Sequence, residues 1–421
     1  MTSCEPCSSK RLRILLLNQT FHPDLVATAY YSSQLAKELA GRGHAVDVVT
    51  GRRAYDDPTR LYESHEEWEG VNIHRLTGTG LGKSRKWRRV VDFASVGLKT
   101  LARAFFLPRA DVVIALTSPP LISVLAAIVC ALRGGRFVYW VMDLNPDAAI
   151  SAGWLRNGSW VGRVLEWLSR FSFGRSSDII VLDEYMAQRV LDKGVSEAKL
   201  HVIPPWLNED HVRFDKTGRE EFRKRHGLDE KFVAMYSGNH SPCHPLCDVL
   251  QAAGQMREQC PEVVFVFVGG GSEYRRMRQE ASEKGLSNVL FLPYQEWDQL
   301  SGSLSAADLH IVAMGQPFVG IVHPCKLYNV LSVNAPVLLV APAVCHLVNV
   351  MKETAEPGMW ARVDHGDGAA VMNAVLQFKE MGKRPDGQSY AKAIQARSAD
   401  MLLPEIVNIV ENVAGAEGAI S

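Results

Sequence analysis

The stretch "VVFVFVGGGSEYRRMRQEASEKG", residues 263–285, carries the pattern from which the fold can be predicted. Its first six residues are β-branched or aromatic, which predicts a buried strand. Three glycines follow and predict a tight turn, and the remainder is a polar segment of helical character. A buried strand that leads through a short turn into a helix is typical of a parallel sheet in an α/β protein.

The same pattern recurs on both sides of this stretch. "LRILLLNQTF" (12–21) predicts a strand, "YYSSQLAKELAGRGH" (30–44) a helix and "AVDVVTG" (45–51) a second strand. "KFVAMYSGNHSP" (231–242) starts a second series. We therefore predict two doubly wound α/β domains that face an interdomain cleft. The predicted parts are a tail at 1–11, domains at 12–206 and 207–396, and a final helix at 397–421 that packs on either domain.

Composition and charge restrict the function. The 421 residues are 47% hydrophobic and 22% charged, which is ordinary for a soluble globular protein. Lys+Arg and Asp+Glu both total 46, so net charge gives no sign of nucleic-acid binding. No apolar run approaches the roughly 20 residues of a membrane span. Eight irregularly spaced cysteines and no secretory signal pattern lead us to expect a cytoplasmic, reduced protein.

One segment is strongly basic. Between Gly82 and Arg109 there are eight Lys or Arg residues and one acid. An apolar stripe runs along the helix predicted here, at Trp87, Val90, Val91, Ala94, Leu98, Leu101 and Phe105. We expect the stripe to cover the sheet and the basic end to contact an anionic membrane on its cytoplasmic side.

Several common sites are disfavoured. The first loop, "LNQTFHPD", contains no glycine, so a dinucleotide fingerprint is absent, and no P-loop lysine motif occurs. Cys4 and Cys7 form a CxxC pair in a polar tail without a second ligand pair. His240, Cys243, His244 and Cys247 suggest zinc, but two prolines interrupt a regular ligand face.

Three strand-to-helix loops suit an anion. Gly269–Gly271 allow close backbone approach, and Gly238, Asn239, His240 and His244 follow the first strand of the second domain. Lys326 lies in "PFVGIVHPCKLYNVLSVNAPVLLVAP" (317–342), which contains no other cation and no acid. The glycines also have a purely structural explanation, because a tight turn needs them. Lys326 has one too, since most lysines in the first turn of a helix are simply solvated. Together the loops favour a diphosphate ligand.

The chain resembles the retaining GT-B glycosyltransferases (family 4-like) over about residues 12–415, in particular the branch that builds bacterial polysaccharides and glycolipids. The stretches that carry the resemblance are "LLLNQTFHPD", "YWVMDLNPD", "MYSGNHSPCHPLCDVLQAA", "VGGGSE" and "GIVHPCKLYNVLSVNAPVLLVAP". It implies two Rossmann-like domains, with the nucleotide-sugar donor bound by the second and the acceptor by the first. The implied donor-binding residues are Gly238, Asn239, His240, His244, Gly270, Gly271, Tyr294, Pro324, Lys326, Leu327 and Asn329.

This sequence departs from the family pattern at two acids. Many members carry two glutamates eight positions apart, and these positions hold Ile321 and Asn329 here. The loop after residue 237 also lacks the Arg or Lys that many members place there. Phosphate charge would then depend on Lys326, His244 and backbone N–H groups.

The resemblance and the residues together predict transfer of a hexosyl or N-acetylhexosaminyl group. The donor is a nucleotide sugar, UDP-type favoured, and the acceptor a lipid-linked or other glycan in surface polysaccharide or glycolipid synthesis. We expect Lys326 to stabilise the leaving diphosphate. Asp143 orients or deprotonates the acceptor hydroxyl, or, in a purely structural role, caps the next turn. Asn18 and His22 line the acceptor wall. We expect retention, no cofactor and no metal. A sugar-nucleotide 2-epimerase and a non-catalytic partner subunit are the alternatives.

Overall fold

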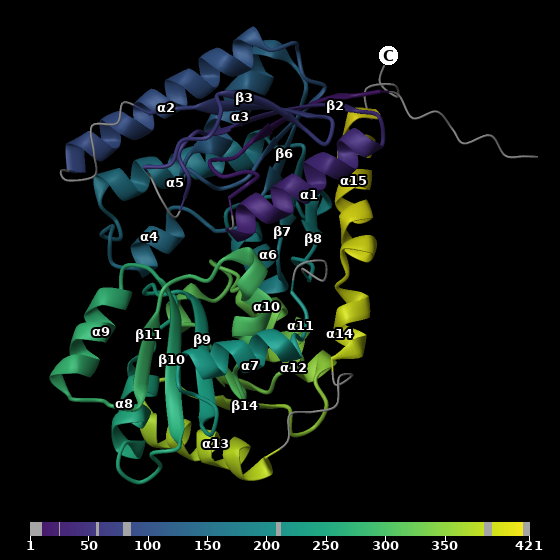
Figure 1. Ribbon diagram of the computed structural model, residues 1–421. Coiled ribbons are helices and arrows are strands. Elements are labelled where there is room, and N and C mark those ends of the chain that lie inside the picture. Colours follow the sequence, from purple (N-terminus) through teal and green to yellow (C-terminus); the bar gives the residue numbers. More distant parts are fainter. Residues whose placement is uncertain are drawn as a thin grey trace, which may run out of the picture.

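The computed structural model describes residues 11–24, 26–55, 59–78, 86–207, 212–382 and 390–415, with no side chains described for 86–94 and Ala393. Two α/β domains lie one above the other in Figure 1, the first coloured purple to teal and the second teal to yellow-green. Each is built on its own sheet. The predicted fold class, two Rossmann-like domains with parallel sheets, is confirmed.

The sheet of the N-terminal domain has the strand order β3-β4-β2-β1-β5-β6-β7-β8. Only the β3–β4 pair is antiparallel among these described strands. β1 pairs with β2 and β5, because a strand whose last four residues are apolar and buried belongs in the sheet centre. The strands are β1 (Arg13–Leu17), β2 (Ala45–Gly51), β3 (His65–Trp68), β4 (Val71–Leu76), β5 (Val112–Ala115), β6 (Arg136–Trp140), β7 (Asp178–Val181) and β8 (Leu200–Val202).

Helices cover both faces of this sheet. The helices are α1 (Ala27–Gly41), α2 (Lys86–Phe106), α3 (Ile122–Arg133), α4 (Asp147–Ser151), α5 (Trp160–Arg175), α6 (Glu184–Leu191) and the 3-10 turn η1 (Glu197–Lys199). α3 packs between α2 and α5 and on β5 and β6 (Figure 1). None of the described helices combines the length and the apolar character that crossing a bilayer requires.

The predicted stripe of α2 holds only in part: Trp87, Val90, Val91 and Ala94 lie outside the described side chains, and Leu101 packs against the core. Thr100, Ala104 and, one residue beyond the helix, Leu107 are buried, whereas Leu98 is 69% exposed. Phe105 is also exposed, with its ring under the Arg133 guanidinium. The predicted stripe is therefore wrong at Leu98 and Phe105, since a small residue, Ala104, makes the close approach to the protein core.

The C-terminal domain has a six-stranded parallel sheet in the order β11-β10-β9-β12-β13-β14. α8 and α13 cover one face, while α7, α10 and α11 lie on the other. The strands are β9 (Phe232–Asn239), β10 (Val263–Gly270), β11 (Val289–Leu292), β12 (Leu309–Ala313), β13 (Val337–Val340) and β14 (Trp360–Val363). The helices are α7 (Lys216–Arg225), α8 (Cys247–Met256), α9 (Tyr274–Glu283), α10 (Trp297–Ser305), η2 (Gln316–Phe318), α11 (Lys326–Ser332), α12 (His346–Thr354), α13 (Gly368–Met381) and α14 (Ala391–Ala396).

The segment between η2 and α11 joins the two domains. Val322 forms an antiparallel bridge with Asp143, and Leu144 N donates to Ile321 O at 2.9 Å. Arg189 Nε donates to Val319 O at 2.7 Å. At Gly320, whose φ is 70°, a Cβ would lie 2.5 Å from Tyr185 O, so only glycine fits this contact. Backbone and side-chain contacts therefore both join the domains along this segment.

The last helix, α15 (Ala399–Gly415), returns to the N-terminal domain. It packs on α1 and on β5, β6 and β7 and lies along one side of the N-terminal domain in Figure 1, above α14. Its buried side chains belong to the N-terminal core: Leu402, Leu403, Ile406, Val407, Val410 and Val413. The N-terminal core is thus completed by the end of the described chain.

Ile406→Ala should destabilise the N-terminal domain by about 2–5 kcal/mol, because Ile406 is 1% exposed in its core. Glu405→Ala, at the exposed neighbouring position, is the matched control and should change stability by less than about 0.5 kcal/mol. Urea unfolding followed by tryptophan fluorescence measures both. Equal midpoints for the two variants would contradict the packing of α15.

Candidate functional site

Lys326, the first residue of α11, reaches across to the end of β9. Its Nζ donates a hydrogen bond to Tyr236 Oη and lies 4.1 Å from the centre of that ring. Tyr236 Oη in turn donates to Asn239 O at 2.7 Å. A Cβ at Gly238 would lie 3.3 Å from Lys326 Nζ. The lysine is therefore held beside a loop that leaves room for it.

Burial lowers the pKa of Lys326 to about 7, with small opposing effects from the Cys243 and Cys325 thiols. No salt bridge is described for this amine. An ammonium held in a desolvated place without a paired carboxylate is the arrangement expected where an anionic ligand supplies the missing charge.

The two glycine loops are packed against each other. His240 N donates to Gly270 O at 2.7 Å, and Glu273 N donates to His240 O at 3.1 Å. Gly271 has a φ of 131°, and a Cβ there would clash with His240 O and Asn239 Oδ1. Close packing alone therefore explains why residue 271 is a glycine. A role of the turn in binding a ligand stays a prediction.

Tyr294 covers the outer side of this turn. A Cβ at Gly270 would lie 3.1 Å from the Tyr294 ring, and one at Gly269 would lie 3.3 Å from it. The ring is 51% exposed, and burial raises the pKa of its hydroxyl to about 12. A half-exposed aromatic face beside a glycine turn is suited to stacking on a planar ring of a ligand.

The histidines of the first loop do not carry charge. His240 is fully buried between the rings of Tyr236 and Tyr274, and burial lowers its pKa to about 4. His244 Nδ1 lies 2.8 Å from Ala313 O, so Nδ1 must hold the proton. Burial, followed by Lys326, lowers the pKa of His244 well below its usual value. His244 is therefore neutral at neutral pH in this structure, and its contact with a phosphate stays a prediction.

Asp143 faces the same region from the N-terminal domain. Burial raises the pKa of its carboxyl to about 6. Burial also raises the pKa of the Cys243 and Cys325 thiols, and at both thiols Asp143 raises the pKa further whereas Lys326 lowers it. These two thiols lie within electrostatic range of both charged groups. The structure thus brings Asp143 and Lys326 to one interdomain site.

Asn18 and His22 lie in the loop after β1. Asn18 is fully buried, and its Nδ2 donates to Thr20 O at 2.7 Å. His22 stacks on Trp68 with ring centres 4.3 Å apart, and burial lowers its pKa. Asn18 thus holds its own loop, while His22 remains partly exposed.

The remaining predicted residues surround the start of α11. Pro324 and Leu327 are buried, and the Leu327 side chain belongs to the C-terminal core, so it offers only backbone to a ligand. Ile321 is also buried. Asn329 is partly buried on α11, at the position where many family members carry the second glutamate.

Sequence reasoning did not identify Tyr236 and Tyr55. Tyr236 lies within β9, where a tyrosine suggests only a core residue. Tyr55 is exposed and lies within electrostatic range of Asp143 in its own domain and of Tyr294 in the other. Neither position had a motif that could have revealed it, since both become significant only when the domains meet.

Comparison with known families gives two matches that divide the chain in the same way as the structure. Residues 27–206 match the Glycosyl transferase 4-like domain. Residues 218–349 match Glycosyl transferases group 1.

Individual relatives are distant. The chain is 24% identical to the putative colanic acid biosynthesis glycosyl transferase WcaI of Escherichia coli, over 80% of this chain and 85% of that protein. It is 24% identical to a GDP-mannose-dependent phosphatidylinositol monomannoside mannosyltransferase of Mycobacterium tuberculosis, over 70% and 71%. The crystal structure of Anabaena HepE with UDP-glucose superposes with a TM-score of 0.71 at 16% identity, over 96% and 100%.

The Lys326 amine should titrate near pH 7, far below an ordinary lysine at 10.5, because burial disfavours its charged form. It is then a cation at pH 6 and mostly neutral at pH 8. NMR of isotope-labelled lysine side chains measures the midpoint, with Lys326→Arg to assign the signal. A midpoint above pH 9 would show that water reaches the amine freely.

Proposed function

Because the chain is a glycosyltransferase of the GT-B fold, with a 4-like domain followed by a group 1 domain, we propose that it transfers a sugar from a nucleotide diphosphate to a glycan acceptor in surface polysaccharide or glycolipid synthesis. The proposed acceptor is lipid-linked. The proposed chemistry retains the anomeric configuration and uses no metal.

The observation that carries this proposal is the buried Lys326 amine, which has the Cys243 and Cys325 thiols as electrostatic neighbours in common with Asp143. The lysine lies beside Gly238 without a described salt bridge, and its charge is desolvated. A diphosphate placed there would pair with the ammonium and keep it protonated. As the bond from the sugar C1 to the diphosphate oxygen breaks, the cation stabilises the charge that develops on that oxygen.

Asp143 is proposed to act on the acceptor. Its raised pKa, about 6, suits a group that accepts a proton near neutral pH. The acceptor hydroxyl oxygen forms the new bond to C1, and its proton passes to the carboxylate or is oriented by it. We propose that His22, beside Trp68, lines the acceptor side, with Asn18 shaping the loop.

The proposed donor is of the UDP type. HepE, with a similar fold, was crystallised with UDP-glucose, whereas the mycobacterial relative is named for GDP-mannose. We propose that the base stacks near the exposed Tyr294 ring at the glycine turn, and that Asn329 takes over the ribose contact of the missing glutamate.

The acceptor face is proposed to rest on a membrane. α5 exposes Trp160 by 77%, Val164 by 46% and Trp167 by 64%, and the α4–α5 loop exposes Trp154 by 72%. Tryptophan favours the lipid–water interface. α4 also contacts the other domain, because Ser151 Oγ donates to Pro317 O at 3.2 Å. A bilayer on this surface would present lipid-linked acceptors near the interdomain site, together with the predicted basic segment 83–109.

The alternatives are less favoured. Both family matches and the relatives quoted above are to glycosyltransferases, which disfavours the 2-epimerase. A non-catalytic subunit does not explain why the two domains bring a carboxyl and an uncompensated ammonium to one site.

Wild-type enzyme should release nucleotide from one of the UDP-, GDP- or ADP-sugars in the presence of a bacterial lipid extract, and Lys326→Ala should lower that rate by about 100-fold or more. Asp143→Asn should slow transfer while donor binding persists. Product analysis by mass spectrometry and nucleotide release measure the two steps. Release without a glycosylated product would favour the epimerase.

Lys326→Arg is the matched control for charge. Donor affinity of the wild type should weaken severalfold between pH 7 and pH 9, because the amine loses its proton as the pH rises through its pKa of about 7. The arginine stays charged over this range, so its affinity should change little. Parallel pH profiles for both enzymes would contradict the assigned role.

Trp160→Ser with Trp167→Ser should reduce binding to anionic phospholipid vesicles about tenfold, because both exposed rings would leave the interface. Val344→Ser with Met401→Ser removes exposed apolar residues away from α5 and should bind like wild type. Vesicle sedimentation measures all three proteins. Unchanged binding of the tryptophan variant would exclude α5 as the contact surface.

A further inference from the structure

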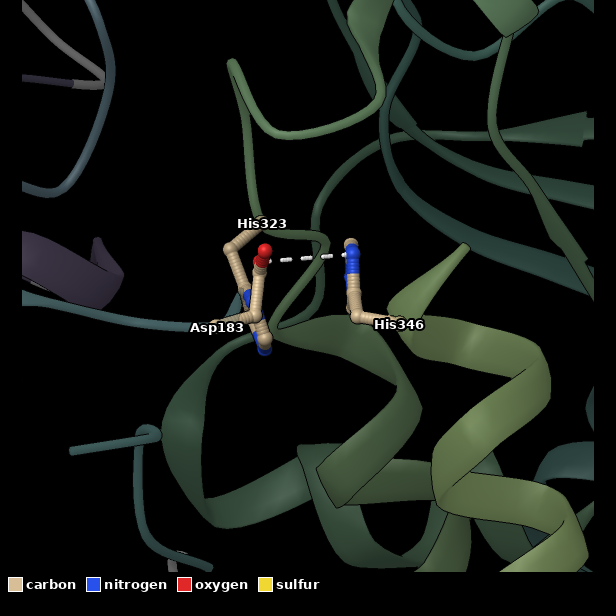
Figure 2. Close-up of side chains that lie close together, drawn as sticks. All are labelled: Asp183, His323 and His346. Carbon is tan, nitrogen blue, oxygen red and sulfur yellow. Dashed lines mark hydrogen bonds and ion pairs between the residues drawn. The ribbon is translucent and has the colours of Figure 1, made fainter. Parts of the chain in front are cut away.

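A second polar cluster lies at the domain junction. Asp183 follows β7 and caps α6, where its Oδ1 accepts from Met186 N at 2.9 Å. His323 precedes α11, and His346 is the first residue of α12. Figure 2 shows the three side chains converging from these separate elements. All three are buried, and one comes from the N-terminal domain and two from the C-terminal domain.

The ligand atoms of these residues lie close together. His323 Nδ1 is 2.8 Å and His346 Nδ1 is 3.4 Å from the same atom, Asp183 Oδ2. One ligand atom from each residue lies within 4.8 Å of the others. Among the described residues, no other group of three His, Cys, Asp or Glu side chains meets this criterion, and the loop of His240 and Cys243 is not part of one.

Internal hydrogen bonds account for two of the three residues. Asp183 accepts from Met186 N and pairs with His323 Nδ1, and His323 Nε2 lies 2.8 Å from Tyr328 Oη. These contacts also lower the pKa of Asp183, in opposition to its burial. A structural role between the domains is therefore sufficient for Asp183 and His323.

His346 is not explained in this way. It is 2% exposed, and neither ring nitrogen has a hydrogen-bond partner. Its ring stacks on that of His323 with centres 4.0 Å apart, and its Nδ1 lies 3.4 Å from Asp183 Oδ2. A buried, unpartnered imidazole is costly, so a ligand that accepts its lone pair would stabilise the folded chain.

We propose that Asp183, His323 and His346 bind a divalent transition-metal ion, of which Zn²⁺ fits best, at the junction of the two domains. Two imidazoles and a carboxylate are a donor set that zinc accepts. Bonds of about 2.0–2.2 Å in a tetrahedron place neighbouring ligand atoms about 3.3 Å apart. The 2.8 and 3.4 Å from the two imidazoles to Asp183 Oδ2 bracket this separation. The rings are stacked at 17° in the structure, and each lone pair lies in its own ring plane, so binding one ion requires the two imidazoles to turn out of this stack.

The surroundings complete such a site. A tyrosine hydroxyl can donate or accept, so Tyr328 Oη can accept a hydrogen bond from His323 Nε2–H when Nδ1 binds the ion, which fixes the tautomer. A cavity of about 90 Å³ borders the cluster and is lined also by Asn349 and Arg397. It offers room for water as a fourth ligand. A metal ion bound here would tie the two domains together. This inference does not depend on the proposed glycosyl transfer.

The test uses the full chain with Cys4→Ser and Cys7→Ser, since the CxxC pair of the tail, outside the described residues, is another possible zinc ligand. After chelator treatment, zinc is added in competition with a chromophoric chelator. We expect one zinc per chain and a rise in melting temperature of several degrees. Cobalt should give the visible bands of tetrahedral Co²⁺ without thiolate-to-metal charge transfer.

His346→Asn should weaken zinc binding at least about 100-fold, and Tyr328→Phe about tenfold because it frees the orientation of His323. His201→Asn is the matched control: His201 pairs with Asp178 at 2.7 Å, and the described residues give this pair no third ligand, so the variant should bind zinc like the parent. Circular dichroism checks that the variants fold.

Absence of stoichiometric zinc in the parent chain would overturn the proposal. So would zinc binding that folded His346→Asn retains at full affinity, or a cobalt spectrum dominated by thiolate charge transfer. The cobalt spectrum of the parent chain decides the matter even if His346→Asn fails to fold.

Discussion

The backbone bridge between Asp143–Leu144 and Ile321–Val322 is the interaction on which the geometry of the site depends. It fixes the carboxyl end of β6 against the segment that leads into α11. Asp143 is itself a bridge residue, and Lys326 lies four residues after the other one, Val322. The two backbone contacts hold the Asp143 and Lys326 positions in a fixed relation, and the close approach of Gly320 to Tyr185 O keeps the segment against the first domain.

Much of the fold follows from the sequence, because parallel strands buried on both faces appear as uninterrupted apolar runs, as in residues 263–268 and 337–340. The rule that ligands bind beyond the carboxyl ends of such strands led to Asp143 and the glycine turns. The same rule applied to "SDIIVLD" would have indicated Asp183, which sequence reasoning passed over.

What could not be predicted depends on the meeting of the domains. The face of α2 that is buried was misjudged, because small residues such as Ala104 give no apolar signal yet permit the closest packing. The tautomer of His244 is set by one carbonyl, Ala313 O, contributed by a strand 69 residues away, and its lowered pKa comes from burial and from Lys326. Periodicity reports on one element at a time, whereas protonation depends on all the elements packed around a group.

The return of α15 has a consequence for synthesis of the chain. Leu402 to Val413 fill the core of the first domain, although they are made about 200 residues after its last strand, β8. Chains are synthesised from the N-terminus, and domains usually fold in the order in which they are made. Here the second domain has all its strands and core before the first can close. Until α15 is synthesised, the apolar surface of the first domain that it covers stays exposed. We expect chaperones to bind the nascent chain at this stage.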